Sequence, residues 1–165
     1  MKSAFELKAS LALVAAFCVT GTAVAQTYPK EGNYDYTACW SGVSNVLAFS
    51  KTHSAATFEF TGTVQTNPGG GIFDRTTFRC VGMNQLFDGK PLATVVCEGV
   101  DAQGDKVLSH YSTEGSKTVR TTVLGTGKYE GMVSSGTAVP VGSFPVAKPG
   151  TFQNCNRQTG TYKLK

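Results

Sequence analysis

The sequence predicts an all-β protein and, within that class, a single antiparallel β-barrel of eight strands. Apolar and polar residues alternate with a period of two along much of the chain. Nowhere do apolar residues recur at spacings of three and four over a dozen positions, as an amphipathic helix requires. The 19 glycines suit a barrel with tight corners. A β-sandwich is the alternative, because strand count and turn spacing do not separate the two architectures.

The first 25 residues are predicted to be a cleaved secretory signal peptide. Two lysines precede a short apolar run, and the run ends in the small-residue site Ala23-Val24-Ala25. We therefore expect cleavage after Ala25 and a mature chain, residues 26–165, that forms one domain in the periplasm or outside the cell. Lipid attachment at Cys18 is disfavoured, because the bulky Phe17 precedes it.

The charge of the mature chain points to no polyanionic partner. Residues 26–165 carry 13 basic and 10 acidic residues, a mild net charge of +3. The basic residues are scattered, so neither nucleic acid nor an anionic membrane surface is expected as a partner. No later segment reaches the roughly 18 apolar residues of a transmembrane helix, and no membrane insertion is expected.

Four cysteines remain in the mature chain, and an even number in an exported protein predicts two disulfides. None of them has the C-x-x-C spacing of a zinc site, and the two histidines lie far apart in the sequence, so no metal is expected. The sequence also lacks a nucleophile elbow, an HExxH motif and a dinucleotide fingerprint. We therefore expect no cofactor.

The first two strands follow a short polar lead-in. Tyr34–Trp40 places its aromatic residues on one face of a strand, and Val43–Phe49, which is of ambiguous type, is read as its continuation. Ser54–Gln65 alternates more clearly and is the second strand. The run Asn67–Gly71 contains a proline and three glycines, so it is expected to be an exposed loop. Trp40 is most simply a core residue, with ligand stacking as the alternative.

The segment Thr76–Val100 is predicted to be a hairpin, because Asp88-Gly89 is a strong signal for a two-residue turn of the primed type. In that register the numbers of opposed residues add up to 177, so Cys80 lies opposite Cys97. The two form a non-hydrogen-bonded pair, whose α-carbons lie about 4.5 Å apart, a distance that a disulfide accepts. A disulfide between them is therefore expected.

Cys39 and Cys155 are left, by elimination, to form the second disulfide. The first and last strands of a closed up-and-down barrel are neighbours, so this bridge would join them. In the chain-entropy model it would contribute about 4–5 kcal/mol to stability, because it closes a loop of more than about 100 residues.

The rest of the chain is predicted to supply the remaining strands. The first two of these strands each follow a turn rich in polar residues and glycine, and the two turns are Asp101–Asp105 and Glu114–Ser116. Prolines and glycines recur from Pro140 to Gly150, which is read as an irregular crossing segment. The expected strands are Lys106–Tyr111, Lys117–Leu124, Lys128–Ser134 and Thr159–Lys165.

Three residues are candidates for catalysis: Glu98, Arg79 and His110. In the hairpin register Arg79 lies opposite Glu98, and alternation leaves open which way their face points. Inside the barrel the two would be a charge pair retained for a ligand or a reaction, and outside a surface pair contributing a fraction of a kcal/mol. His110 is a general base only if it faces the lumen, and is otherwise an ordinary strand histidine. Trp40, Arg79, Glu98 and Tyr129 are the candidates for ligand binding.

The pattern G-T-G-K-Y-x-G, residues 125–131, resembles the corner of the eight-stranded barrels of the allene oxide cyclase and dirigent type. The resemblance implies an antiparallel barrel with an apolar lumen. Barrels of this type are often oligomeric, so a homo-oligomer is one expectation. In the enzymes of that family it implies a cyclisation or coupling without a cofactor. Only the corner residues carry over, all as structural residues, and no catalytic residue of the family has a match here. They are Gly125, Gly127, Tyr129 and Gly131.

Three functional hypotheses follow. The first is an exported, non-catalytic barrel that binds a small apolar or amphipathic molecule in its lumen. The second is a cofactor-independent isomerase or cyclase of the allene oxide cyclase type. The third is a structural or protein-interaction module with a filled barrel. The volume of the lumen separates the first from the third, and an ionisable group at its bottom separates the second from the first.

Overall fold

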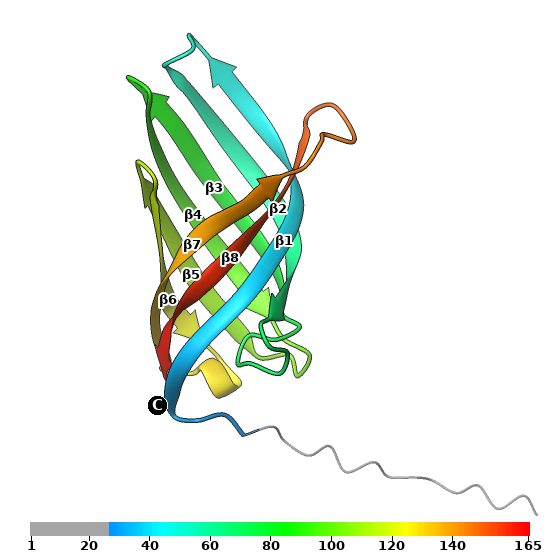
Figure 1. Cartoon of the computed structure of the whole chain (residues 1–165), viewed down its shortest axis with the longest axis vertical. Coiled ribbons are helices and arrows are strands. Elements are labelled where there is room, and N and C mark those ends of the chain that lie inside the picture. The colour runs from blue at the N-terminus through cyan, green and yellow to red at the C-terminus, as the bar shows by residue number, and fades with distance from the viewer. Residues whose placement is uncertain (1–26) are drawn as a thin grey trace, which may run out of the picture.

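Residues 27–165 are described by the structure, a computed structural model, and they form a closed antiparallel barrel of eight strands (Figure 1). Each strand pairs with its neighbours in the chain, and the first pairs with the last. The predicted barrel is thereby confirmed over the sandwich. The predicted signal peptide and Cys18 lie outside the described residues. The elements are β1 (Glu31–Ala48), β2 (Ser54–Thr66), β3 (Thr77–Phe87), β4 (Lys90–Val100), β5 (Lys106–Glu114), β6 (Lys117–Gly125), η1 (Gly127–Tyr129), β7 (Val133–Ser143) and β8 (Thr151–Lys163).

The Asp88-Gly89 turn joins β3 to β4 as predicted. Both residues have positive φ, 51° and 75°, as a primed turn requires. Phe87 pairs with Lys90 and Cys80 pairs with Cys97, so the register is the expected one. Cys80 and Cys97 form a disulfide. A two-residue turn signal was therefore sufficient to place this bridge.

The second disulfide also has the expected partners. Cys39 of β1 is bonded to Cys155 of β8, 116 residues further along the chain. The two residues lie directly opposite each other where the first strand pairs with the last. The bridge therefore links the two strands whose pairing closes the barrel.

The strand connections alternate between the two ends of the barrel (Figure 1). One end carries the β1–β2, β3–β4, β5–β6 and β7–β8 connections, and we call it the open end. The other end carries the remaining connections and the C-terminus, and we call it the closed end. There the β2–β3 connection, residues 67–76, turns Ile72 and Phe73 into the barrel, where they are 2% and 3% exposed. None of the described residues forms a helix long and apolar enough to cross a membrane.

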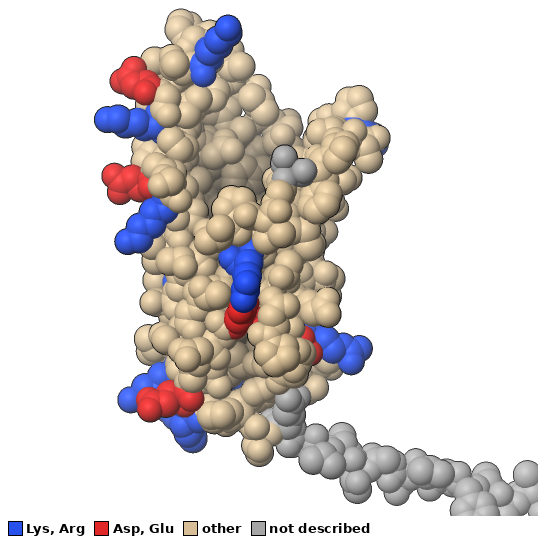
Figure 2. All heavy atoms as spheres, viewed as in Figure 1, with Lys and Arg blue, Asp and Glu red and all other residues tan. Residues whose placement is uncertain are grey.

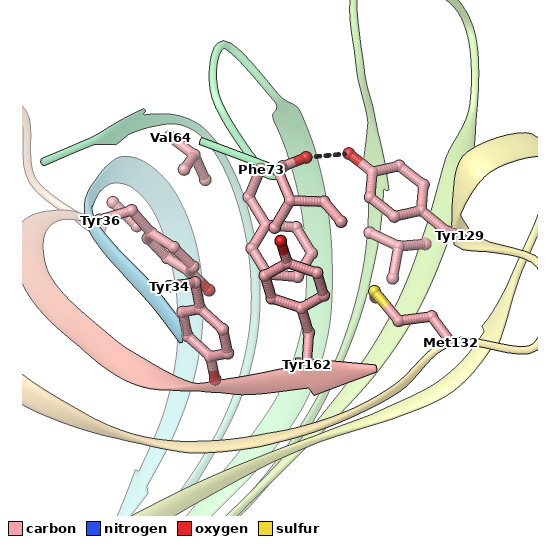
Figure 3. Close-up of a cluster of buried hydrophobic side chains, with 10 residues drawn as sticks. Tyr34, Tyr36, Val64, Phe73, Tyr129, Met132 and Tyr162 are labelled. Atoms are coloured by element: carbon pink, nitrogen blue, oxygen red, sulfur yellow. Dashed lines mark hydrogen bonds between the residues drawn. The ribbon is translucent and has the colours of Figure 1, made fainter. Parts of the chain in front are cut away.

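A cluster of buried rings fills the closed end (Figure 3). Phe73 packs edge-on against Tyr34 and stacks on Tyr129, with ring centroids 5.2 and 5.8 Å apart. The Tyr129 hydroxyl donates a hydrogen bond to the backbone carbonyl of Ile72 at 3.0 Å. Tyr129 is completely inaccessible to solvent. The β2–β3 connection and the η1 turn therefore lock each other in place and plug this end of the barrel.

The glycine-rich corner differs from the prediction. Lys128–Ser134 is expected to continue as a strand, but Gly127–Tyr129 form one turn of 3-10 helix, and β7 begins only after it. Gly127 and Gly131 have φ values of +52° and +66°, so the chain turns sharply on each side of Tyr129. The corner therefore inserts a tyrosine into the closed end instead of extending the sheet.

The last two strands are longer than predicted. The segment from Pro140 to Ser143 belongs to β7, and β8 begins at Thr151 instead of Thr159. A proline fits in this part of β7 because pairing with β6 ends at Thr137, so beyond it the strand pairs with β8 alone. A proline on the free edge of a strand costs no ladder hydrogen bond. The irregular segment is thus confined to the β7–β8 connection.

Candidate functional site

The part of the lumen above the closed end is hollow, with a cavity of about 470 Å³. The space-filling view shows a recess between the strand tips at the open end (Figure 2). Every strand except β7 contributes side chains to the lining. Alternate residues of a strand face the same side, so the lining comes from even positions of β1, β2, β3, β6 and β8 and odd positions of β4 and β5.

The upper wall of the cavity is aromatic. Its five rings come from β1, β2, β3 and β8, and Phe60 contacts the other four, with centroid distances of 5.4–6.2 Å. All five are half-buried and border the cavity. They form a continuous apolar surface suited to contact with an apolar ligand. The rings are those of Trp40, Phe58, Phe60, Phe78 and Phe152.

Glycines on neighbouring strands explain why these rings line the cavity without filling it. Gly62 lies opposite Trp40 on one side and Phe78 on the other, and a Cβ at Gly62 would come within 2.5 Å of Phe78 Cζ. Gly82 lies opposite Phe58, and a Cβ there would come within 2.8 Å of that ring. The rings therefore lie directly over glycine backbone and leave the middle of the lumen empty.

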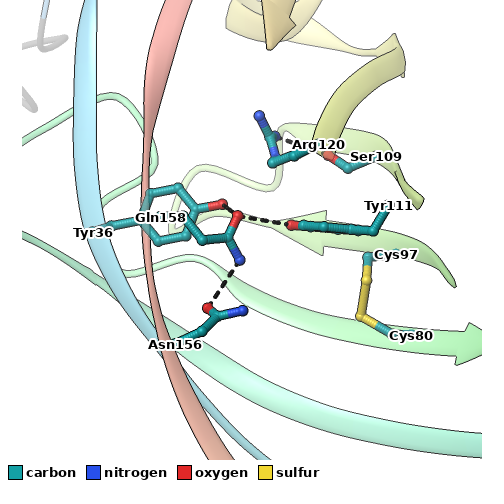
Figure 4. The surroundings of a disulfide bond; sticks show 8 residues. All are labelled: Tyr36, Cys80, Cys97, Ser109, Tyr111, Arg120, Asn156 and Gln158. Atoms are coloured by element: carbon teal, nitrogen blue, oxygen red, sulfur yellow. Dashed lines mark hydrogen bonds between the residues drawn. A yellow bond between two sulfur atoms is a disulfide. The ribbon is translucent and has the colours of Figure 1, made fainter. Parts of the chain in front are cut away.

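The floor of the cavity is polar (Figure 4). The hydroxyls of Tyr36 and Tyr111 both donate to Gln158 Oε1, at 2.5 and 3.3 Å, and Gln158 Nε2 donates to Asn156 Oδ1 at 3.1 Å. Burial raises the pKa of Tyr36 well above its ordinary value, so its hydroxyl stays a neutral donor. This network brings β1, β5 and β8 together across the barrel.

Arg120 of β6 lies deep in the lumen and is almost fully buried, with 2% of its surface exposed. Its Nη1 donates to the Ser134 hydroxyl at 2.7 Å, and its Nη2 donates to the Ser109 hydroxyl at 2.8 Å. Its Cζ lies 4.6 Å from the ring centroid of Phe73 and 5.5 Å from that of Tyr34. Burial lowers the pKa of Arg120, but the surrounding tyrosines outweigh this effect and the pKa is raised. The guanidinium is therefore charged.

No carboxylate neutralises this charge. The cations that form ion pairs within residues 27–165 are His53, Arg79, Lys106, Lys128, Arg157 and Lys165. No Asp, Glu or His belongs to the lining of the cavity in this part of the chain. In addition, Nε of Arg120 is buried without a hydrogen-bond partner. Arg120 is thus an unpaired positive charge inside the barrel.

The two disulfides lie on opposite faces of the sheet. Cys80–Cys97 lines the cavity, close to the tyrosine and glutamine of the floor (Figure 4). Cys39 lies between two residues that face the lumen, Ala38 and Trp40, so its bond to Cys155 is on the outside.

Two of the candidate residues form separate ion pairs on the outer face of the barrel. Arg79 Nε lies 2.7 Å from Glu59 Oε1, and Glu98 Oε1 lies 3.3 Å from Lys106 Nζ. All four side chains are about half exposed or more. Arg79 and Glu98 are opposed in register as expected, but neither lines the cavity. Arg79 and Glu98 thus share the outer face of the β3–β4 hairpin, a point that the alternation of side chains in the sequence did not decide.

The other candidates are divided between the cavity and its surroundings. Trp40 lines the cavity. His110 is on the outer face of β5, where its Nε2 makes a 2.9 Å hydrogen bond with the Thr94 hydroxyl. Tyr129 is buried in the closed end and does not line the cavity. The structure therefore brings only one of the five candidates to the cavity.

Sequence reasoning missed Arg120, and the pattern of β6 explains why. In Lys117–Leu124 valines alternate with polar residues, so simple amphipathicity turns the valines inward, yet Val123 is 59% exposed and Arg120 is buried. The signal that could have found it is the hairpin around Gly115-Ser116, whose register places Arg120 opposite Tyr111.

No group of three or more His, Cys, Asp or Glu side chains within residues 27–165 is arranged to hold a metal ion. The chain matches no protein-family model, no curated protein and no solved structure. The eight-stranded barrel that the glycine-rich corner implied is present. The likeness to allene oxide cyclase is limited to the sequence of that corner, and no comparison shows membership of that family.

Proposed function

We propose that this protein is an exported, non-catalytic barrel that binds a small apolar or amphipathic molecule in its lumen. One observation carries the proposal: a cavity of about 470 Å³, plugged at one end and walled by aromatic side chains. Pockets for small molecules are typically 300–1,000 Å³ in volume, mostly apolar, with a few polar groups that orient the ligand. The lumen meets each of these criteria.

The disulfides support the export part of the proposal. Two structural disulfides are typical of proteins that fold in an oxidising compartment, such as the periplasm or the extracellular space. The Cys39–Cys155 bond lies on the outer face, where a reducing cytosol would have access to it.

The chemistry of the lining favours binding over catalysis. A general base that works near neutral pH is usually a histidine or a carboxylate, and neither belongs to the lining described above. The ionisable groups there are Arg120, Tyr36 and Tyr111. The raised pKa values of Arg120 and Tyr36 keep both protonated. The empty volume, in turn, favours a ligand over a filled barrel.

A pair of tryptophan variants on adjacent residues of β2 tests the proposal. Ala56 faces the cavity and Ala55 faces outward, so Ala56→Trp places an indole in the lumen and Ala55→Trp places the same indole outside. The probe is N-phenyl-1-naphthylamine, a neutral apolar dye that fluoresces on leaving water. We expect the wild type and Ala55→Trp to bind it, and Ala56→Trp to bind about tenfold more weakly or worse.

Equal binding by the two variants would place the dye outside the lumen and contradict the proposal. Absence of dye binding by the wild type would contradict it as well. Thermal unfolding of both variants checks that each is folded before the titration.

A further inference from the structure

Arg120 is the least expected residue in the lumen. Burying an isolated charge costs several kcal/mol unless it is paired and hydrogen-bonded. The groups that contact its guanidinium are all neutral: two serine hydroxyls and the rings of Phe73 and Tyr34. Aromatic faces offset part of the cost but do not neutralise the charge. The lumen therefore retains a cation at a place where an apolar residue would destabilise the folded protein less.

The two serines hold the guanidinium in a fixed orientation. Ser109 lies on β5 and Ser134 on β7, so the bonds to Nη2 and Nη1 tie Arg120 to the strands on both sides of β6. A guanidinium has five N–H groups, and these bonds use two of them. Nε is buried and makes no hydrogen bond of standard geometry among residues 27–165, and the neutral Tyr34 hydroxyl near the guanidinium is likewise without one. The cation is thus pre-positioned with donor capacity to spare.

The cavity has its charge and buried tyrosines at the floor and aromatic rings on its wall, with neutral polar residues such as Asn84 and Thr113 nearer the strand tips. Arg120 belongs to the same lining as the tyrosine and glutamine of the floor, whereas the five aromatic rings form the wall towards the open end. A ligand that enters from the open end therefore passes the apolar wall before it reaches the charge. This sequence of surfaces matches a molecule with an apolar body and one anionic end.

We propose that the lumen ligand is an apolar carboxylic acid, whose carboxylate binds at Arg120 and whose body lies against the aromatic wall. The inference rests on the proposed lumen-binding function and names the ligand class for that site. Arginine suits this task because its planar guanidinium matches the geometry of a carboxylate. The incoming anion supplies the counter-charge that the chain itself does not place beside Arg120.

A matched pair of ligands tests the inference on the unmodified protein. Decanoic acid and decan-1-ol have the same chain, and only the acid is ionised at about pH 7.5. Both are titrated into protein stripped of bound lipid, with binding read by calorimetry. We expect the acid to bind about 10- to 100-fold more tightly than the alcohol, the range for hydrogen bonds to a charged group.

Three arginine variants assign that preference to a residue. In Arg120→Met the preference for the acid should disappear. In Arg79→Met, which removes an arginine from the outer face, the preference should be kept in full. Arg120→Lys keeps the charge but not the planar fork and should keep only part of the preference. A purely structural Arg120 would not make the wild type discriminate between acid and alcohol.

The outcomes separate this inference from the proposed function. If decanoic acid and decan-1-ol bind the wild type equally well, the inference fails and lumen binding stands. If the naphthylamine dye binds but neither ligand does, the inference also fails. If neither ligand nor dye binds, both proposals fail. If Arg120→Met does not fold, the acid–alcohol comparison on the wild type still decides the matter.

Discussion

The two ends of this barrel are built from similar residues, yet one is filled and the other is hollow. At the closed end the rings of Tyr34, Phe73 and Tyr129 are at most 5% exposed. Towards the open end, Trp40 and Phe60 are only half-buried and border a cavity. Aromatic content alone therefore does not decide whether an eight-stranded barrel is packed or empty.

The difference arises from what lies beside each ring. At the closed end, Phe73 and Tyr129 come from segments outside the strands, and Phe73 packs against both Tyr129 and the strand residues Tyr34 and Tyr36. The five rings that line the cavity all come from strands, and glycines across the ladder, such as Gly62 and Gly82, let them lie against the wall. Three substitutions, each with a control, test this account.

The largest effect is expected at the plug. Phe73→Ala removes a ring that contacts Tyr34, Tyr36, Tyr129 and Arg120 in a closed space, so the free energy of unfolding should fall by about 3–5 kcal/mol. Phe152→Ala is the control, because that ring already borders the cavity and should cost only about 1–2 kcal/mol. Guanidinium titration with the disulfides intact measures both.

Equal losses for the two variants would mean that the hollow half is as tightly packed as the plug. That result would remove the basis for a lumen ligand, because a wall packed as tightly as the plug is inconsistent with an empty cavity beside it. A loss at Phe73 below that at Phe152 would have the same consequence.

The two halves were unequally predictable from the sequence. The register of the β3–β4 hairpin, and with it the Cys80–Cys97 bond, followed from one local turn signal and the alternation of side chains. The plug did not follow, because Ile72 and Phe73 come directly after a run of glycines, and such runs are normally exposed. Its burial depends on contacts with Tyr34 and Tyr129, which are distant in the chain.

Arg120 escaped prediction for a related reason. Its strand places small apolar residues outside and polar residues inside, the reverse of the usual arrangement. Local amphipathicity gives the wrong face in such a case, and only a register counted from the β5–β6 turn gives the right one. The residue most informative about function is thus the one that breaks the local rule.

A second effect, of intermediate size, concerns the charges that fasten the closed end. Oδ2 of Asp101, in the β4–β5 turn, lies 2.7 Å from Nζ of Lys128 in η1, and the side chain of Asp101 is 1% exposed. Burial raises the pKa of Asp101, but the nearby ammonium of Lys128 and the hydrogen bonds from the backbone of Gln103 and Asp105 outweigh this effect and lower the pKa overall. The ion pair therefore stabilises the fold above the unfolded carboxyl pKa of about 3.9, and this contribution is lost as the pH falls through the lower pKa of the folded state.

Asp101→Asn should lower the free energy of unfolding by about 2–3 kcal/mol at neutral pH, because it removes one partner of a buried pair. The difference from wild type should shrink on acidification, since the wild-type carboxylate is then protonated as well. Asp88→Asn at the open end is the control: Asp88 is 85% exposed beside His53, and its loss should cost less than about 1 kcal/mol. A pH-independent difference for Asp101→Asn would show that the pair does not fasten the plug.

The smallest effect is expected at a glycine of the hollow half. A Cβ at position 62 would collide with the backbone carbonyl oxygen of Cys39 and lie 2.5 Å from Phe78 Cζ. In Gly62→Ala the β1–β2 backbone pairing must therefore shift, and the Phe78 ring must move as well. Overpacking of this kind costs about 1–3 kcal/mol. Because the displaced ring takes space from the lumen, the naphthylamine dye should also bind more weakly. Gly69→Ala is the control, since nothing lies within 4 Å of a Cβ there, and it should change neither stability nor dye binding. If Gly62→Ala bound the dye as well as wild type, glycines would not be what keeps the lumen open, and the contrast between the two ends would need another cause.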